Sequence, residues 1–553
     1  MSEILSLKKS NCKNCYKCIR HCSVKAIRFS AGQAHVVENE CILCGHCFAV
    51  CPQNAKQISS DLEKVHVMLA ASPVYASIAP SFAAAFPGIG IDALEKAIQK
   101  LGFRAAEETA AGAAMVKTEY ERILREEKPD ILLSSCCTSV NLLMTKHYPD
   151  LLFTLAPVLS PAQAHCADLK RRHPEAKTVF IGPCIAKKQE VSEAIDAVLS
   201  FEELRDWLEA EQIPLIPEPD QSIGGKTRAF PTTGGVLSTM EKLPEYTYLA
   251  VDGVTNCISV LDELRSGGLS RCFIELSACP GSCANGPLLG RSHPSPARNT
   301  AQIIRYTKEH EFSVEQPTRE QLQHTFFPVP HTTKLPTEYQ IEEMLAKMGK
   351  NNMGERLNCG SCGYNTCREK AIAVLQGRAE QSMCLPYMMK KAEGFSETVV
   401  ANSPNAILVL NDNFEVQKIN PVACKLLHVR NEKDVLGENV VRLMEPEVFR
   451  NVRVSSKNQV SDRAYLPEYD CYVDRTILYN REYHLFICIM RDVSDQVRQQ
   501  EKKLETRMQA LEIANDMAKK QLKIVQEIAS LLGETAADSM IAIEHLKETI
   551  SDD

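Results

Sequence analysis

Two closely spaced runs of cysteines near the N-terminus constrain this chain more than any other feature. Residues 12–22 read CKNCYKCIRHC and residues 41–52 read CILCGHCFAVCP. Each run has the spacing C-x2-C-x2-C-x3-C, in which three thiolates meet on one iron–sulfur cube and the fourth reaches a second cube. The alternative is structural zinc, which takes four ligands in one site rather than a doubled run. The spacing therefore predicts two 4Fe–4S clusters, one held by Cys12, Cys15, Cys18 and Cys51 and the other by Cys41, Cys44, Cys47 and Cys22.

The chain as a whole is rich in cysteine, with 23 among 553 residues. In a reducing compartment so many thiols serve as metal or cluster ligands more often than as disulfides. A formal net charge of −7 argues against a nucleic-acid partner, which selects a basic surface. The sequence contains neither a run of about 18 apolar residues, as a membrane span requires, nor the apolar core of a signal peptide at its start. We therefore expect a cytoplasmic iron–sulfur protein with no membrane partner.

The next part of the chain, residues 65–310, alternates apolar runs that read as strands with helical patterns. This alternation is typical of an α/β domain. The runs are VHVMLAA at 65–71, DILLSS at 130–135, KTVFIG at 177–182, YLAVDG at 248–253 and CFIEL at 272–276. Three runs end in cysteine motifs, LLSSCCTS, VFIGPCIAKKQE and FIELSACPGSCANG. Ligands at strand ends suit one buried site that is assembled from distant segments.

These three motifs, in this order behind a ferredoxin-type module, resemble the signatures of the active domain of iron-only (FeFe) hydrogenases. LSPAQ at 159–163 and FPTTGGV at 230–236 also match that family. The resemblance covers roughly residues 1–310 and implies an H-cluster domain at 65–313. It implies reversible heterolytic cleavage of H2 into protons and electrons, an electron-carrier protein such as ferredoxin, and maturation proteins that install the diiron part of the cluster.

The resemblance also implies roles for single residues. Lys187 matches the lysine that donates a hydrogen bond to a cyanide ligand, and Cys136 matches a thiol that relays protons. Glu119 falls at one glutamate of the family's proton path. A plainer alternative makes Cys136 a spare small hydrophobe. The thiolates implied for the 4Fe–4S part of the H-cluster, the last of which also bridges to a diiron unit with CO, cyanide and dithiolate ligands, are Cys137, Cys184, Cys279 and Cys283.

The chain departs from the family pattern along the proton path. Val116 and Ala156 stand where the family has a second glutamate and a serine, and neither side chain can pass a proton. Unless water or Glu121 substitutes, we expect slow proton delivery, which suits a protein that senses H2. Positions close to the diiron unit also differ, namely Thr138, Val140, Gly182 and Ser277.

A fourth group of cysteines follows a polar stretch at 314–337 that reads as a linker. Its spacing, C-x2-C-x4-C-x16-C, resembles a small 4Fe–4S domain of electron-transfer proteins, with a zinc knuckle as the alternative. Such a cluster would give electrons an exit toward the C-terminal parts of the chain. Its four ligands would be Cys359, Cys362, Cys367 and Cys384.

Residues 396–494 resemble a PAS domain, a common sensory module. A strand, an Asn-rich turn at 411–413, a second strand and a helix start at Asn420 form its opening, and Arg-Asp-Val-Ser at 491–494 resembles the junction to a signalling helix. A PAS ligand is not identifiable. Four residues could ligate a cofactor but are more often core, namely Cys424, Cys471, Cys488 and His428.

From residue 495 onward the sequence reads as one helix. One set of apolar residues recurs every seven positions, from Val497 through Leu504 and Leu511 to Leu532, and Asn515 lies in the second seam. This pattern predicts a coiled coil and hence a homodimer, with Asn515 setting the register. The alternative is a helix packed on its own PAS domain. Because the chain shows no kinase or phosphatase domain, either enzyme is expected as a separate downstream partner.

The sequence thus predicts a multidomain α/β protein and a hydrogen-sensing FeFe-type hydrogenase. Two other functions stay open: a bulk ferredoxin-dependent or electron-bifurcating hydrogenase, and a non-enzymatic hydrogenase-like protein of electron transfer or cluster assembly. The cofactors expected are three 4Fe–4S clusters and the H-cluster. The expected domains are a ferredoxin-like module at 1–60, the H-cluster domain at 65–313, the linker at 314–337, a small 4Fe–4S domain at 338–395, a PAS domain at 396–494 and a coiled-coil helix at 495–553.

Overall fold

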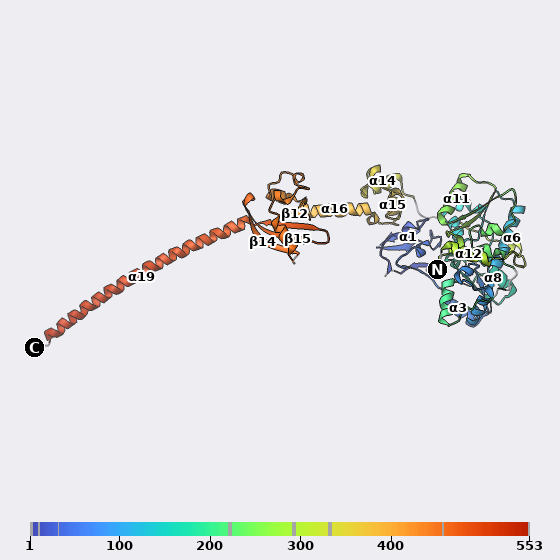
Figure 1. Ribbon diagram of the computed structural model, residues 1–553, viewed down its shortest axis with the longest axis horizontal. Coiled ribbons are helices and arrows are strands. Elements are labelled where there is room, and N and C mark those ends of the chain that lie inside the picture. The colour runs from blue at the N-terminus through green and yellow to red at the C-terminus, as the bar shows by residue number, and fades with distance from the viewer. Residues whose placement is uncertain are drawn as a thin grey trace. The chain divides into compact units, whose positions relative to one another are not determined.

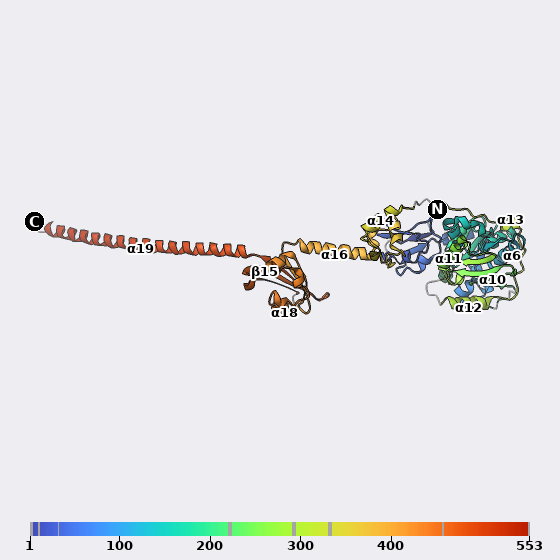
Figure 2. The ribbon, with the colours of Figure 1, turned by 90° about the horizontal axis from the view of Figure 1, so that it is seen from above.

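The computed structural model divides the chain into two compact units, Met1–Met388 and Met389–Asp553 (Figures 1 and 2). It describes residues 4–8, 11–30, 32–218, 220, 224–289, 295–329, 335–455 and 458–550. Within these ranges, no helix is both long enough and apolar enough to cross a lipid bilayer.

The first unit begins with a small N-terminal module, residues 4–58, built from two short antiparallel pairs. Strand β1 (Leu5–Leu7) pairs with β4 (Lys56–Ile58), and β2 (Ile27–Ser30) pairs with β3 (Gln33–Val36). Each cysteine run contains one helical turn, α1 (Lys17–Arg20) and α2 (His46–Ala49). Gly45, directly before α2, has a φ of 74°, a left-handed conformation that favours glycine. The cysteines therefore lie on tight turns, as cluster ligands do.

Two parallel sheets form the α/β part of the first unit. The first has strand order β6-β5-β8-β9 and the second β10-β11-β7. Their strands are β5 (Val74–Ile78), β6 (Ala105–Glu108), β7 (Ile131–Leu133), β8 (Lys177–Gly182), β9 (Ala197–Ser200), β10 (Thr247–Asp252) and β11 (Cys272–Ser277). The helices are α3 (Leu62–Ala71), α4 (Phe82–Ala85), α5 (Ile91–Lys100), α6 (Ala110–Glu126), α7 (Thr138–His147), α8 (Pro161–Arg172), α9 (Phe201–Ala210), α10 (Gly235–Thr239), α11 (Val254–Ser266) and α12 (Pro296–Tyr306). Short 3-10 helices are η2 (Pro149–Thr154), η3 (Ala186–Glu190), η4 (Lys226–Ala229) and η5 (Ser282–Asn285).

One expected strand is wrong: residues 65–71 belong to helix α3. Val65 and Met68 are buried while His66 and Val67 are exposed, which is the spacing of a helix face and not the alternation of a strand. A short apolar run does not distinguish the two by itself. The strand lies directly after it, as β5.

The carboxyl ends of strands from both sheets converge. Residues beyond the ends of β5, β7, β8 and β11 line one cavity, among them Ala79, Cys137 and Cys184. The cysteine motifs begin where β7, β8 and β11 end. The fold thus brings three distant segments to one region.

The stretch expected as a linker, 314–337, is partly packed on the α/β part. It contains α13 (Arg319–Leu322), and Leu322 is buried. The Leu159 amide donates to the Leu322 carbonyl, and the Val329 amide donates to the Thr145 carbonyl. Composition pointed to a linker because the stretch is polar, but its backbone finds partners up to residue 329. Residues 330–334 lie outside the described ranges.

The small cysteine domain, residues 338–384, completes the first unit. Helices α14 (Glu338–Lys347) and α15 (Cys367–Leu375) pack through Ile341, Leu345 and Ala371. It also contains η6 (Met353–Glu355) and η7 (Gln381–Met383). Helix α16 (Leu385–Ala401) follows and runs into the second unit.

The second unit is built on a five-stranded antiparallel sheet of order β13-β12-β16-β15-β14. The strands are β12 (Ala406–Asn411), β13 (Val416–Ile419), β14 (Gln459–Leu466), β15 (Cys471–Asn480) and β16 (Leu485–Asp492). The Asn420 side chain caps α17 (Pro421–Leu426), where the sequence predicted a helix start. The remaining short helices are α18 (Glu447–Val454), η8 (Glu432–Asp434), η9 (Val440–Arg442) and η10 (Pro467–Tyr469). Cys471 and Cys488 are buried core residues of this unit.

The chain continues into one long helix, α19 (Ser494–Ile550). Its apolar seam is exposed, with Leu504 at 61%, Leu511 at 59% and Leu532 at 65%. A long helix with an exposed apolar seam is the pattern expected of one helix of a coiled coil without its partner helix.

Candidate active site and cluster-binding cavities

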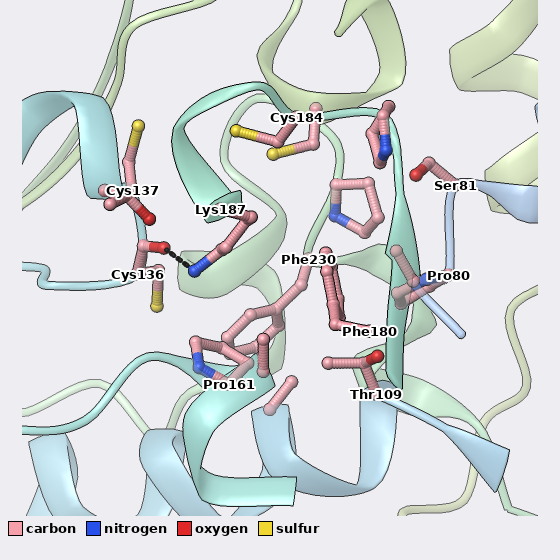
Figure 3. Close-up of a pocket in the computed structure, with 17 residues that line it drawn as sticks. Pro80, Ser81, Thr109, Cys136, Cys137, Pro161, Phe180, Cys184, Lys187 and Phe230 are labelled. Atoms are coloured by element: carbon pink, nitrogen blue, oxygen red, sulfur yellow. Dashed lines mark hydrogen bonds between the residues drawn. The ribbon is translucent and has the colours of Figure 1, made fainter. Parts of the chain in front are cut away.

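The strand ends of the α/β part enclose a cavity, here called the strand-end cavity. Its wall combines cysteines from all three motifs with small and aromatic residues (Figure 3). Cys136 and Cys137 follow β7, Cys184 follows β8, and Cys283 lies in η5 after β11. The full lining is Ala79, Pro80, Ser81, Thr109, Ala113, Cys136, Cys137, Thr138, Pro161, Ala162, Phe180, Pro183, Cys184, Lys187, Phe230, Pro231 and Cys283.

Cys279 lies against a neighbouring cavity that it shares with Cys44. Burial, and then the nearby thiols of Cys184, Cys283 and Cys137, raise the pKa of Cys279 well above its usual value. Burial raises the pKa of Cys184 to about 11 as well. The structure therefore brings the four predicted H-cluster thiols together. The raised pKa values of Cys184 and Cys279 mean that a bound metal would have to deprotonate them.

Two polar side chains of the strand-end cavity, those of Ser81 and Lys187, indicate whether an H-cluster would fit. The Ser81 hydroxyl is fully buried and, within the described part of the chain, has no hydrogen-bond partner. Lys187 supplies a cation against an otherwise mostly apolar wall. A buried unsatisfied donor is costly, so a group that brings hydrogen-bond acceptors would complete this cavity. The residues present fit an H-cluster with anionic ligands.

Lys187 is anchored by a buried carboxylate. Its Nζ donates to both oxygens of Glu190, at 2.8 and 2.9 Å, and lies 3.4 Å from the Cys136 carbonyl oxygen (Figure 3). Burial alone would lower the pKa of Lys187, but the Glu190 carboxylate and the nearby thiols of Cys184 and Cys137 raise it. Lys187 therefore stays charged.

Glu190 also explains two further motif residues. Its carboxylate accepts hydrogen bonds from the Thr138 hydroxyl and, at 2.6 Å, from the Ser160 hydroxyl. Ser160 is the N-cap of α8 and forms a capping box with Gln163. The LSPAQ motif thus starts a helix and fixes the carboxylate that holds Lys187.

The Cys136 thiol contacts the hydroxyl of a tyrosine. It lies 3.3 Å from the Tyr120 hydroxyl, which in turn lies 2.9 Å from the Ser135 hydroxyl. Burial raises the pKa of Cys136 to about 12, despite the lowering effects of Tyr120 and Lys187. Glu119 accepts from the Arg122 guanidinium at 2.7 Å.

The two residues that stand at the glutamate and serine positions of the hydrogenase pattern lie in the core. Val116 and Ala156 are both completely buried among apolar neighbours. Glu121, the suggested substitute, accepts from the Glu241 amide at 2.7 Å and lies 3.6 Å from Lys117. It is therefore engaged elsewhere.

Sequence reasoning missed two residues here, Tyr120 and Glu275. Burial raises the pKa of Glu275 to about 7, although the backbone amides of Leu237 and Gly234 counteract this shift. Its charge also acts on Cys136. The sequence contained a signal for Glu275, a carboxylate inside the apolar run CFIEL. Buried carboxylates are rare and often belong to functional sites.

The N-terminal module holds two groups of thiols. Cys12, Cys15, Cys18 and Cys51 line one cavity. Cys44 interacts electrostatically with Cys22, Cys41 and Cys137, and burial raises its pKa to about 12. The structure thus places the cysteines of each predicted ligand set close to one another.

The second of these groups packs against the H-cluster loops. A Cβ added at Gly45 would lie 2.6 Å from Ile185 Cδ1 and 2.6 Å from Pro287 Cγ. Ile185 follows Cys184, and Pro287 lies four residues after Cys283. Only a glycine permits this approach of the Cys44–Cys47 turn.

The small cysteine domain has its own cavity, lined by its four cysteines together with Lys350 and Lys370. Burial lowers the pKa of Lys370 to about 8. Hydrogen bonds from Ser361 lower the pKa of Cys359, which is exposed. In the described ranges, no three His, Cys, Asp or Glu side chains are arranged to hold a single metal ion.

Three segments of the chain match family models. Residues 72–287 match "Iron only hydrogenase large subunit, C-terminal domain", residues 4–67 match "4Fe-4S dicluster domain" and residues 355–386 match "Putative Fe-S cluster".

The similar curated proteins are hydrogenases. Iron hydrogenase 1 of Clostridium pasteurianum is 26% identical over 296 residues, covering 42% of this chain and 51% of the relative. The NADP-reducing hydrogenase subunit HndD of Solidesulfovibrio fructosivorans is 24% identical, covering 47% and 58%. The periplasmic [Fe] hydrogenase large subunit of Nitratidesulfovibrio vulgaris is 26% identical, covering 51% and 85%. The chain thus spans little more than half the length of the first two relatives.

Solved structures are similar only in part. The [FeFe]-hydrogenase HydA1 of Chlamydomonas reinhardtii has a TM-score of 0.41 and 17% identity, covering 49% of this chain and 99% of that one. The PAS domain of an HTR-like protein from Haloarcula marismortui has a TM-score of 0.17 and 20% identity, covering 19% and 96%. Residues 72–287 of this chain are an iron-only hydrogenase large-subunit domain, which the chain combines with a 4Fe–4S dicluster domain at residues 4–67.

Proposed function

We propose that this chain is a hydrogen-sensing FeFe-type hydrogenase, in which Cys137, Cys184, Cys279 and Cys283 hold the H-cluster. When bound, the H-cluster supplies the site at which H2 is split into protons and electrons, or formed from them. One observation carries the proposal: thiols from three strand ends, a charged lysine and an unsatisfied serine hydroxyl face one buried cavity. The three hydrogenase relatives support it.

The protein's own residues orient the group in a mostly apolar cavity. Lys187 and Ser81 offer hydrogen-bond donors to anionic ligands, and charge-assisted bonds of this kind are strong in a dry site. Glu190 keeps Lys187 charged and in place. Phe180, Phe230 and the prolines make much of the wall apolar.

Proton movement begins at Cys136. Because its pKa is raised, the Cys136 thiol carries its proton near neutral pH, so it can take up a proton released inside the cavity only as it passes its own proton outward. Its hydrogen-bond partner Tyr120 is the next group that can both accept and donate. Glu119, the neighbour of Tyr120 on α6, remains the proposed outer carboxylate. The buried Val116 and Ala156 interrupt the usual route, which supports low turnover and hence a sensory role.

Electrons leave through the N-terminal module and the small cysteine domain, and the redox state of their clusters reaches the PAS-like unit and helix α19. The proposed homodimer is supported by the exposed seam of α19, because such a seam is stable when a second copy covers it. A kinase or phosphatase would then read the state of the coiled coil. The proposed compartment is the cytoplasm.

Infrared spectroscopy tests the hydrogenase proposal most directly. Full-length protein would be reconstituted with iron and sulfide and then loaded with a synthetic diiron unit. We expect carbonyl and cyanide bands that change on addition of H2, and their loss in Cys283→Ser. Absence of the bands in loaded wild type would leave a non-enzymatic iron–sulfur protein. Turnover matching that of a bulk hydrogenase, measured in parallel, would contradict the sensory role.

A further inference from the structure

The small cysteine domain docks on the N-terminal module, although the contacting residues Lys25 and Gly363 lie 338 positions apart in the sequence. Lys25 Nζ donates to the Gly363 carbonyl oxygen at 2.8 Å, and the Arg20 guanidinium donates to the Ser361 carbonyl oxygen at 3.1 Å. The Phe29 amide donates to the Arg378 carbonyl oxygen at 2.7 Å, and the Arg378 side chain pairs with Glu40 at 2.6 Å. In Figure 1, α15 lies beside the segment that carries α1.

Apolar packing makes the docking specific. Ile19 of α1 and Tyr364 are both nearly fully buried and belong to one apolar cluster, which also contains Met383. Gly363 has a φ of 94°, and a Cβ added there would lie 2.8 Å from Ile19 Cγ2. A larger residue at position 363 would therefore push the two domains apart.

The docked surface faces one particular group of thiols. The ammonium of Lys25 interacts electrostatically with Cys22 of the N-terminal module and with Cys362 of the small domain. Tyr364 interacts with the same two thiols. Cys22 is a proposed ligand of the cluster that Cys41, Cys44 and Cys47 complete. That same group of ligands packs on the H-cluster loops at Gly45.

We propose that this second cluster of the N-terminal module is a branch point, and that the cluster of the small domain receives its electrons from it across Lys25 and Tyr364. In the step, the second cluster loses one electron, the cluster of the small domain gains one, and no proton moves. The inference rests on the proposed function only in requiring that both 4Fe–4S clusters are present. Since a reduced cluster is more negative, the Lys25 ammonium between the two ligand sets favours the reduced form of both.

The test uses full-length protein that contains its 4Fe–4S clusters but no diiron unit, reduced with dithionite. Reduced 4Fe–4S clusters are paramagnetic, so neighbouring clusters split or broaden each other's electron paramagnetic resonance signals. We expect such an interaction between the second N-terminal cluster and the cluster of the small domain. It should disappear in Gly363→Val and in Cys384→Ser, the latter identifying the partner cluster.

The midpoint potentials of the two clusters show whether Lys25 acts through its charge or only through its place in the structure. Lys25→Met should shift the midpoint potentials of both clusters to more negative values, and Lys25→Arg should restore them. Lys146→Met is the matched control, because the Lys146 ammonium donates to the Cys41 carbonyl oxygen at 2.7 Å but not to the small domain. It should shift the second N-terminal cluster alone.

Two results would overturn the inference: a spin interaction unchanged in Gly363→Val, or a Lys25→Met variant whose small-domain cluster keeps its potential. If Gly363→Val fails to fold, the Lys25 series still decides. Because none of these measurements needs the diiron unit, a failure of the hydrogenase proposal leaves their outcome unaffected.

Discussion

The strand-end cavity and the cavity of the small cysteine domain both collect cysteines, but their surroundings differ. In the strand-end cavity, burial raises the pKa of Cys136 to about 12 and that of Cys184 to about 11. The one lysine that lines it, Lys187, is bound to a buried carboxylate. In the small domain, Cys359 is exposed with a lowered pKa, and two buried lysines line the cavity.

This difference separates proton chemistry from electron storage. A mostly apolar cavity with one anchored cation favours the protonated form of Cys136 and Cys184. The cavity of the small domain is lined by two lysines and, among the described residues, by no carboxylate. This arrangement favours an added electron, because a positive charge stabilises the reduced cluster. Under the proposed function, the first cavity would split H2 and the second would register the electrons released.

The largest expected effect is on cluster loading. Cys283→Ser should abolish the infrared bands of a loaded diiron unit and with them H2-dependent reduction of a dye. Cys359→Ser should leave H2 splitting largely intact. In this variant, H2 should no longer change the activity of the proposed kinase or phosphatase partner that reads helix α19. Loss of H2 splitting in Cys359→Ser would remove the division between the two cavities.

The second expected effect is on proton delivery. Cys136→Ala should lower H2 turnover by about 100-fold or more, the usual contribution of a positioned proton-transfer group. Tyr120→Phe should lower it less, because a water can replace one hydroxyl, and Glu119→Gln should lower it least. A Glu119→Gln defect equal to that of Cys136→Ala would return the main route to the carboxylate.

The third expected effect is on stability. Glu190→Gln should destabilise the α/β part by about 3 kcal/mol, because it leaves the buried Lys187 cation uncompensated. Glu343→Gln in α14 is the matched control: its pair with Lys347 is half exposed and should contribute about 0.5 kcal/mol. Calorimetry of both variants measures this contrast, and equal shifts would show that Glu190 is not the anchor.

The smallest expected effect is on thiol reactivity in metal-free protein. Near pH 8, iodoacetamide should modify Cys359 well before Cys136 and Cys184, because the thiolate is the nucleophile. Since the folded-state pKa of Cys184 is raised from 9.0 to about 11, its contribution to stability is complete below about pH 9 and is lost as the pH rises toward 11. Peptide mass spectrometry reads the first prediction, and unfolding midpoints across this pH range read the second.

Much of the site could be predicted because cluster ligands follow local spacing. The cysteines that line the cavity of the small domain lie within 26 residues of one another in the sequence and are gathered as their spacing predicts. Proton partners follow a different rule. Tyr120 and Glu119 are adjacent, yet adjacent helical residues point in directions about 100° apart, and only Tyr120 meets Cys136.

Residues 65–71 and 314–329 show the same limit in the fold. The apolar run of α3 fits a helix or a strand equally well, and the residues packed around it decide between the two. A polar stretch becomes ordered when its backbone finds hydrogen-bond partners. The PAS-like assignment of the second unit and the domain boundaries stay predictions, as do the ligand sets.

By itself, the sequence predicted which cysteines lie together and where the apolar seam of α19 runs, because both depend on spacing along one chain. Only the tertiary structure decided that Glu190 anchors Lys187, that Tyr120 rather than Glu119 faces Cys136, and that Gly363 seats the small domain on Ile19. These contacts join residues distant in the sequence or choose between neighbours by direction, and packing in three dimensions sets both.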